Sequence, residues 1–491
     1  MLVLNHFYKL KHDTKRTYII GPERNSVEKF GARPGWRSTI HPIYAMVLSF
    51  FSKPVEEQEA IKDVASFLRI GEDKVKDLIQ RLDSKEPVMI DFDSTVSAFP
   101  PNLLLSAPEE IKEMPVVEYS PEQFVYKEVD LRRHRPFSSP FGVVFMINNT
   151  CATNCLYCYA DKTVAHPTMP WNMVEKIVTD AKRNNIDSFD ITGGEIFIYK
   201  DWPKLLDLLA ENGYKPDLLS TKVPLTEEQI KQFKKYGIQL QISLDSFDAD
   251  ILSTVLNVRP DYRDKIVHTI DLLEQYGIKY QIATVITKYN ESLDSLKGLY
   301  EFLNSKKMIT RWEIRLAFRS LYSRCDFDKI KVTEEQIGVI DDWVTNVLHK
   351  RLQNCNILWV KENNREYFKC STGSRDFPGS RCSANYSHMV ILPDGKVTIC
   401  EQLYWKPKYI IGDVTKDSIP DIWNSDKALK LAFRDKSELR DKSVCKTCKL
   451  WDECEQYPNR CIADILKGYG EENSDYPDPR CSFAPPFVNV M

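Results

Sequence analysis

The chain of 491 residues lacks any long apolar run and any excess of charge of one sign. Its longest apolar stretches, such as IYAMVLSFF, fall well short of the ~20 residues that a membrane-spanning helix needs. The N-terminal stretch MLVLNHFYKLK reaches His and Lys too early to form the apolar core of a signal peptide. A net charge of −3 gives no support to binding of nucleic acid or membrane by the whole protein. We therefore expect a cytoplasmic protein that contacts neither.

A cytoplasmic location determines how the 13 cysteines are interpreted. Structural disulfides are not expected in a reducing compartment, so clustered thiols indicate metal ligands. Eleven of the cysteines fall into two groups, at 151–158 and 370–481. These two groups are the candidate metal centres of the chain.

The first group is the loop CATNCLYCY, which follows the apolar run GVVFM and holds Cys151, Cys155 and Cys158. Disulfides need pairs of cysteines, and a structural zinc site needs four protein ligands. Three thiolates on one short loop instead suit three corners of a cubane iron–sulfur cluster, whose fourth iron stays open for a small molecule. Tyr157 is placed to stack on an aromatic ligand. The alternative is a zinc site that takes its fourth ligand from a distant part of the chain.

Residues 1–95 have the pattern of a small α+β module. NHFYKLK and RTYIIG predict a hairpin, and apolar residues at helical spacing predict three helices within 41–51, 56–68 and 71–82. Gly71 has the position of a C-terminal cap on the second helix. This order resembles a winged helix-turn-helix. The Pro-rich stretch that follows, 96–140, is typical of an extended linker.

Residues 141–340 alternate between strand-like and helix-like segments. The strands are expected to begin near Val143, Ser188, Asp217, Gln239, Lys279 and Thr310. Six strand–helix units predict an α/β fold with a parallel sheet, arranged as a partial (β/α)6 TIM-like barrel because eight units would be needed for closure. Ligands are expected at the carboxyl ends of the strands. Residues 341–365 are expected to form a bridging helix.

Two further motifs end strands of this predicted sheet. DITGGEI carries Gly193, Gly194 and Glu195, where paired glycines let a ligand approach the backbone and the carboxylate can accept from an ammonium group. QISLDS carries Ser243 and Asp245, whose short polar side chains suit ribose hydroxyls. Taken singly, the first motif is equally an ordinary strand-to-helix turn. The second is equally a helix N-cap.

In this order, the three motifs resemble the radical S-adenosyl-L-methionine (SAM) enzyme superfamily over roughly residues 141–320. The resemblance implies a [4Fe–4S] cluster on the loop cysteines whose open iron binds SAM, and a 5′-deoxyadenosyl radical that abstracts hydrogen from a substrate. It also implies cofactor contacts by Tyr157, Gly193, Gly194, Glu195, Ser220, Ser243 and Asp245. The chain departs from the pattern where STK, Ser220 to Lys222, replaces the usual TNG.

The second group of cysteines lies in residues 366–491, where a Pro-Asp-Gly turn in HMVILPDGKVTIC also predicts a hairpin. Its spacings suit zinc when taken alone. After the first group, it resembles the SPASM domain, which carries two auxiliary [4Fe–4S] clusters. The resemblance implies an inner cluster on Cys370, Cys382, Cys400 and Cys461, and an outer cluster on Cys445, Cys448, Cys454 and Cys481. Cys370 lies far before Cys382, and Cys454 lies six residues before Cys461 where three are usual.

The N-terminal module bears on the substrate. Residues 1–95 hold 15 Lys or Arg and 14 Asp or Glu, a balance that does not favour DNA. Before a SPASM enzyme, such a module resembles the precursor-recognition domain of peptide-modifying enzymes, in which a leader peptide adds a strand to the wing and lies against the third helix. The alternative is a structural cap on the barrel.

These resemblances imply a peptide maturase that crosslinks a ribosomally made precursor, with a thioether from Cys to carbon expected first and a carbon–carbon bond second. Three [4Fe–4S] clusters, SAM and an electron donor such as flavodoxin or ferredoxin are expected with it. The alternatives are a maturase that forms formylglycine in sulfatases and, from another class, a zinc-binding winged-helix DNA regulator.

Overall fold

The computed structural model describes residues 1–22, 30–92, 95–107, 117–128, 135–163, 168–322, 325–348, 355–360, 382–455 and 460–486. Contacts divide the chain into two compact units, one formed by Met1–Arg132 with Pro136–Ser138 and the other by Arg133–Arg135 with Ser139–Met491. In the described part of the chain, every helix is too short or too polar to cross a lipid bilayer. The two units are described separately below.

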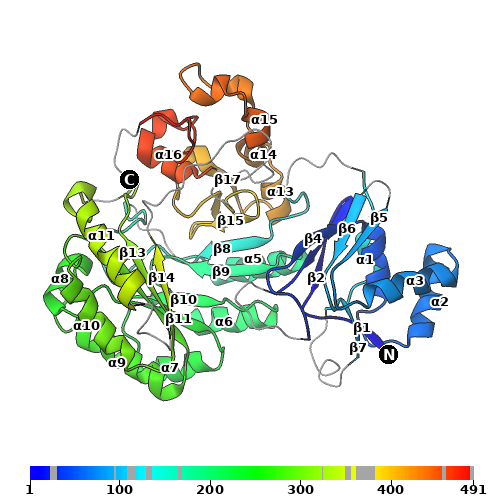
Figure 1. Cartoon of the computed structure of the whole chain (residues 1–491), viewed down its shortest axis with the longest axis horizontal. Helices are drawn as coiled ribbons and strands as arrows, with labels where there is room; N and C mark the ends of the chain where they lie inside the picture. The colour runs from blue at the N-terminus through cyan, green and yellow to red at the C-terminus, as the bar shows by residue number, and fades with distance from the viewer. Residues whose placement is uncertain are drawn as a thin grey trace. The chain divides into compact units, whose positions relative to one another are not determined.

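The first unit is a small α+β fold. Its elements are β1 (Leu2–Leu4), β2 (Lys9–Asp13), β3 (Arg16–Ile20), β4 (Arg37–Ile40), α1 (Pro42–Ser49), α2 (Glu57–Leu68), α3 (Glu72–Leu82), β5 (Val88–Phe92), β6 (Thr95–Phe99) and β7 (Leu104–Ser106). Strands β2, β3 and β4 form an antiparallel sheet, while β5 with β6 and β1 with β7 form two-stranded pairs. The hairpin and three helices expected from the sequence are therefore present (Figure 1).

Helix α3 illustrates why these segments fold. Val75, Ile79 and Leu82 recur at a spacing of three to four residues, and all three are buried in the core of the unit. The positions between them are mostly charged and exposed. One apolar stripe on an otherwise polar helix must be buried against a neighbour, so the helix packs on the unit rather than standing in solvent.

The structure differs from the sequence-based expectations at two points in this unit. The expected linker begins at residue 96, but β6 pairs with β5, and β7 pairs with β1, so the unit continues through the start of the Pro-rich stretch. Its prolines flank these strands rather than interrupting them. The second helix ends at Arg69, which adopts the left-handed conformation with φ of 55°, and Gly71 is instead the N-cap of α3.

The second unit contains two five-stranded sheets. Strands β10 (Leu218–Thr221), β11 (Gln239–Ser243), β12 (Tyr280–Ile286), β13 (Ile309–Leu316) and β14 (Asn356–Val360) form one, with every pairing parallel. The other has the order β17-β16-β15-β8-β9. Its parallel pair β8 (Gly142–Met146) and β9 (Ser188–Thr192) continues into the C-terminal hairpin strands β15 (His388–Ile391), β16 (Lys396–Thr398) and β17 (Ile410–Asp413) (Figure 1).

The six strands expected between residues 141 and 320 are all present, and the α/β fold class is confirmed. They lie in two sheets rather than one, with β9 and β10 in contact at the boundary. Six helices follow strands of this set: α5 (Trp171–Arg183), α6 (Trp202–Glu211), α7 (Glu227–Lys234), α8 (Ala249–Leu256), α9 (Tyr262–Tyr276) and α10 (Leu293–Asn304).

The expected bridging helix at 341–365 differs from the structure. Helix α11 begins earlier, at Glu334, and ends at Trp343, and a π-helical turn covers Val344–Leu348. Residues 356–360 form strand β14, which extends the sheet beside β13. The segment NILWV favours a strand because its β-branched and aromatic residues suit a half-buried sheet surface.

A buried carboxylate joins two parts of the first unit. Asp13 is fully buried at the end of β2. Its Oδ1 accepts hydrogen bonds from the backbone N–H groups of Phe137 (2.8 Å) and Ser138 (2.7 Å), and its Oδ2 accepts one from Arg16 (3.0 Å). Hydrogen bonds to a charged group contribute more than those between neutral groups.

We expect Asp13→Ala to destabilise the first unit by about 1.5–3 kcal/mol, because it leaves two buried N–H groups and Arg16 without their acceptor. Hydrogen exchange in the full-length protein, measured by mass spectrometry on peptides from residues 1–22, reports the local unfolding free energy. Asp63→Ala is the control, since Asp63 is exposed on α2 and its loss should stay within about 0.5 kcal/mol. Equal protection in the two variants would contradict this role for Asp13.

Candidate functional site

The candidate site lies at the carboxyl ends of three strands. The loop after β8 carries Cys151, Cys155 and Cys158, the turn after β9 carries the Gly-Gly-Glu motif, and β10 ends in the Ser-Thr-Lys motif. A cavity of about 200 Å³ collects side chains from all three. Among its lining residues are Cys151, Cys155, Tyr157, Cys158, Gly193, Gly194, Glu195, Ser220 and Lys222. Eight residues expected at the site from the sequence are thus brought together.

Backbone hydrogen bonds hold the cysteine loop in place. The N–H groups of Asn154 and Leu156 donate to the carbonyls of Leu256 and Val255 at the end of α8, each at 2.9 Å. The hydroxyl of Thr153 lies 3.2 Å from the sulfur of Cys155. The loop is therefore fixed by the helix that follows β11, far along the chain.

The two glycines of the motif allow the turn after β9 to approach the start of the cysteine loop. A Cβ on Gly194 would lie 1.9 Å from the carbonyl oxygen of Thr150, and one on Gly193 would lie 2.6 Å from that of Asn148. Gly194 N–H also donates to Asn148 O at 2.9 Å. Any side chain at these positions would push the cysteine loop away, so the glycines are required for packing as well as for ligand access.

Glu195 joins the same two segments and β10. It is 3% exposed, and its carboxylate accepts hydrogen bonds from the backbone N–H groups of Phe197 (3.1 Å) and Lys222 (3.0 Å). Burial raises the pKa of this carboxyl, against the effect of these hydrogen bonds. Glu195 also borders the cavity, and its contact with an ammonium group stays a prediction.

A hydrogen-bonded chain of three side chains begins at the cavity, which Lys222 and Tyr157 line and Asp245 does not. Lys222 Nζ donates to the Tyr157 hydroxyl at 3.1 Å, and that hydroxyl donates to Asp245 Oδ2 at 2.5 Å. Asp245 Oδ1 accepts from the backbone N–H of Val285 at 2.8 Å. The sequence marked Lys222 only as a departure from the usual motif. Its role depends on Tyr157, 65 positions earlier, and on Asp245 at the end of another strand, so no local signal identifies it.

The charge of Lys222 balances the thiols. Burial lowers the pKa of its ammonium group, but Asp245 and the three loop cysteines together raise it above its ordinary value. Conversely, burial raises the pKa of the Cys155 thiol and Lys222 opposes that shift. Lys222 therefore stays protonated and favours the thiolate forms that a metal cluster requires.

Two of the expected cofactor contacts lie elsewhere. Ser243 and Asp245 are 5% and 0% exposed at the end of β11, and they are absent from the residues that border this cavity. In the structure Asp245 anchors Tyr157 and β12 rather than facing the cavity. Their contact with a ribose stays a prediction.

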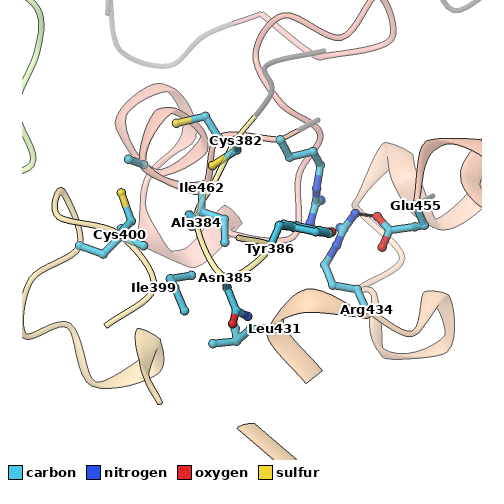
Figure 2. Close-up of a pocket in the computed structure, with 14 residues that line it drawn as sticks. Cys382, Ala384, Asn385, Tyr386, Ile399, Cys400, Leu431, Arg434, Glu455 and Ile462 are labelled. Atoms are coloured by element: carbon cyan, nitrogen blue, oxygen red, sulfur yellow. Dashed lines mark hydrogen bonds and ion pairs between the residues drawn. The ribbon is translucent and has the colours of Figure 1, made fainter. Parts of the chain in front are cut away.

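The C-terminal cysteines gather in two places. Cys382, Cys400 and Cys461 border one cavity (Figure 2), which brings together three of the four residues expected to bind the inner cluster. Cys370, the fourth, lies outside the described residues. Cys445, Cys448 and Cys454 lie within electrostatic reach of one another, as expected for the outer set. The place of Cys481 in that set stays a prediction.

These thiols are not arranged around a single ion. Among the described residues, no three His, Cys, Asp or Glu side chains gather closely enough to hold one metal. A structural zinc site needs four ligands about 2.0–2.3 Å from one atom. The described residues therefore hold no preformed four-ligand zinc site; Cys151, Cys155 and Cys158 border one cavity, and Cys382, Cys400 and Cys461 border another.

Comparisons with known proteins agree with this geometry. Residues 145–303 match the model of the radical SAM superfamily. Residues 382–449 match that of the SPASM iron–sulfur cluster-binding domain. The chain contains a radical SAM domain and a SPASM domain. Both resemblances expected from the sequence are thus confirmed for these two segments, and the two domains imply iron–sulfur clusters and SAM.

Individual relatives are distant. The subtilosin biosynthesis protein AlbA of Bacillus subtilis is 22% identical over 60% of this chain and 62% of its own length. An S-adenosylmethionine-dependent nucleotide dehydratase of Lacinutrix mariniflava is 23% identical over 51% of this chain and 53% of its own. The chain thus spans somewhat more than half the length of these two relatives.

One solved structure covers nearly the whole chain. SuiB of Streptococcus suis, crystallised with the precursor peptide SuiA, matches 98% of this chain and 100% of its own, with a TM-score of 0.64 at 18% identity. At this identity the match establishes the fold, including that of the N-terminal unit.

We expect Gly194→Ala to cost about 1–3 kcal/mol of stability, because the added methyl group collides with the backbone before Cys151. Urea unfolding of the full-length protein measures this cost, and iron content after anaerobic reconstitution should fall with it. Gly338→Ala is the matched control. Gly338 lies exposed inside α11 with open space around it, so its replacement should stabilise by about 0.5–1 kcal/mol.

Tyr157→Phe and Asp245→Asn should each destabilise the radical SAM domain by about 1–3 kcal/mol, because each leaves a buried partner of the chain unsatisfied. The double variant should cost less than the sum of the two, since both remove the same hydrogen bond. Thermal unfolding of the four proteins measures this coupling. Additive effects would show that the Tyr157–Asp245 contact contributes nothing.

Proposed function

We propose that this protein is a peptide maturase, which uses radical SAM chemistry to install an intramolecular crosslink in a ribosomally made precursor peptide. A thioether between Cys and a carbon atom is the first product class, and a carbon–carbon bond is the second. Formation of either bond removes two hydrogen atoms from the peptide.

The observation that carries this proposal is the hairpin of β5 and β6 in the N-terminal unit, which we call the wing. In the described part of the chain, β5 and β6 pair only with each other, and Arg81 in the last turn of α3 donates to the carbonyl of Met89 on β5 at 3.4 Å. Met89, Phe92 and Val96 on this hairpin are 59%, 41% and 52% exposed. An open strand edge beside exposed apolar side chains suits a peptide that adds as a further strand.

The relatives support a peptide as the substrate. AlbA is named for biosynthesis of the bacteriocin subtilosin, and SuiB was crystallised with a precursor peptide. The nucleotide dehydratase is named for a different substrate. A leader-binding unit distinguishes the two classes, because tethering raises the effective concentration of a long substrate and offers nothing to a nucleotide.

The cofactors follow from the cysteine sets. Cys151, Cys155 and Cys158 hold the SAM-binding [4Fe–4S] cluster. Cys382, Cys400 and Cys461 with Cys370 hold the inner auxiliary cluster, and Cys445, Cys448, Cys454 and Cys481 hold the outer one. When bound, SAM and these clusters supply the 5′-deoxyadenosyl radical and the route for the second electron. A flavodoxin or ferredoxin is the proposed electron donor, and the cytoplasm the proposed location.

The residues of the chain supply position and charge. Gly193 and Gly194 fix the cysteine loop against β9, and Tyr157 is held by Asp245 and Lys222. Lys222 contributes a buried positive charge beside three thiolates. The sulfatase maturase alternative shares the two cluster domains but has no need of the wing. The zinc-binding regulator leaves the Gly-Gly-Glu packing unexplained.

Anaerobic reconstitution with iron and sulfide tests the cofactor assignment. We expect about twelve irons per chain and a brown protein that absorbs near 400 nm, consistent with three cubanes. A count of about eight irons would show that one auxiliary cluster is absent. If Cys370→Ser then leaves the count unchanged, the absent cluster is the inner one. Colourless protein that holds zinc would overturn the radical mechanism.

Small Cys-rich peptides encoded beside the gene are the candidate substrates. Incubation with SAM and a reductant should produce 5′-deoxyadenosine and a peptide that has lost two hydrogen atoms, both detected by mass spectrometry. Met89→Glu should raise the KM for such a peptide tenfold or more and leave kcat nearly unchanged, because only leader docking is lost. Val339→Glu, an exposed apolar residue on α11, is the matched control. A fall in kcat alone would contradict leader docking on the wing.

A further inference from the structure

The cavity at Cys382, Cys400 and Cys461 has a charged wall. Figure 2 shows Cys382 and Cys400 on one side, and the ion pair between Arg434 and Glu455 on the other. Arg460 also borders the cavity. Two arginines and one carboxylate at an expected cluster site are not explained by the thiolate ligands alone.

Arg434 is held rigidly in this wall. It follows helix α14 (Asp426–Ala432), and its side chain is 17% exposed while that of its partner Glu455 is 7% exposed. Its guanidinium carbon lies 4.6 Å from the centre of the Trp451 ring, at the start of the short helix α15 (Trp451–Cys454). Stacking and ion pairing together leave the planar group little freedom to rotate.

One nitrogen of this group has no partner. Arg434 Nη1 is buried and makes no hydrogen bond to any described residue. A buried donor that stays unsatisfied costs about 1–3 kcal/mol, and more when it is charged. Native structures rarely retain such a cost, so the geometry calls for an acceptor that the protein atoms do not supply.

The same arginine reaches the second set of thiols. Its charge acts on Cys445 and Cys454, and Arg460 also acts on Cys445. Arg434 therefore stands between the cysteines expected to bind the inner cluster and those expected to bind the outer one.

We propose that Arg434, oriented by Glu455, is a positioning residue that donates a hydrogen bond to the sulfur atoms of an auxiliary [4Fe–4S] cluster and raises its reduction potential. Reduction adds one electron and one negative charge, which a nearby guanidinium stabilises, and hydrogen bonds to cluster sulfurs act in the same direction. The effect is expected on the inner cluster, because Arg434 borders the cavity that Cys382, Cys400 and Cys461 line. This inference rests on the proposed function, which supplies the two clusters.

The test is a redox titration followed by electron paramagnetic resonance. It uses the full-length protein with Cys151, Cys155 and Cys158 replaced by Ala, so that only the auxiliary clusters give signals. Arg434→Gln should make the inner cluster at least tenfold harder to reduce, a shift of about 59 mV to lower potential for one electron. Arg434→Lys keeps the charge and should recover part of the shift.

Glu455→Gln should shift the reduction potential in the opposite direction, to higher values. Loss of the carboxylate leaves the guanidinium charge uncompensated, so the cluster should become easier to reduce. This variant keeps the inference testable if Arg434→Gln binds too little iron to titrate. Arg440→Gln is the control, because Arg440 pairs with Asp475 on the same domain and is 42% exposed. It should leave both potentials unchanged.

Unchanged potentials in Arg434→Gln and Glu455→Gln, or shifts of the same sign, would overturn the inference while the clusters remain. The iron content of the protein with all its cysteines separates this result from failure of the proposed function: that protein should bind about twelve irons, and the variant used for the titration about eight. If the protein with all its cysteines binds only about four irons, the auxiliary clusters are absent, and the proposed function and this inference fail together.

Discussion

The close approach of two backbone segments is the constraint on which the rest of the site depends. The turn at Gly193 and Gly194 lies against Asn148 to Thr150, with no room for a side chain between them. Because the loop cysteines begin at the next residue, this contact sets where the thiols are presented relative to β9 and β10. The hydrophobic core brings the same strands together, and the backbone contact adds the close positioning, within about 0.5 Å, that a functional site needs.

Positive side chains lie near the cysteines of both expected cluster sites. The three loop thiols, Glu195 and Asp245 would place several negative groups in a poorly solvated space, and Lys222 is the cation that acts on all three thiols. The same logic recurs at the SPASM domain, where Arg434 and Arg460 lie beside Cys445. In both places a positive charge lies near cysteines that are expected to bind a cluster, and it opposes the rise that burial causes in the pKa of Cys155 and of Cys445.

Much of the fold could be predicted from the sequence because its signals are local. The runs near Val143, Gln239 and Thr310 are short, apolar and followed by helical patterns, so each strand was found within a residue or two. The three site motifs sit directly at strand ends, where one pattern encodes both the turn and the chemistry. The Pro-rich composition after residue 95 was misleading, since β6 and β7 pair with strands that local composition does not reveal.

What could not be predicted are contacts between residues far apart in the chain. The sequence around Lys222 gives no sign of its contact with Tyr157, which in turn donates to Asp245. Arg434 and Glu455 are 21 residues apart, with no motif connecting them. The pairing of β8 with β15 joins residues separated by about half the chain, which no periodicity can encode.

That pairing has a consequence for the evolution and engineering of such chains. Because β15 hydrogen-bonds to β8, the C-terminal domain completes the sheet whose strand leads into the cysteine loop, rather than being appended after it. Removal of this domain would expose one edge of the apolar strand GVVFM, which could then pair with a strand of another molecule. Exchange of one of these domains between related chains would therefore have to carry a matching sheet edge with it.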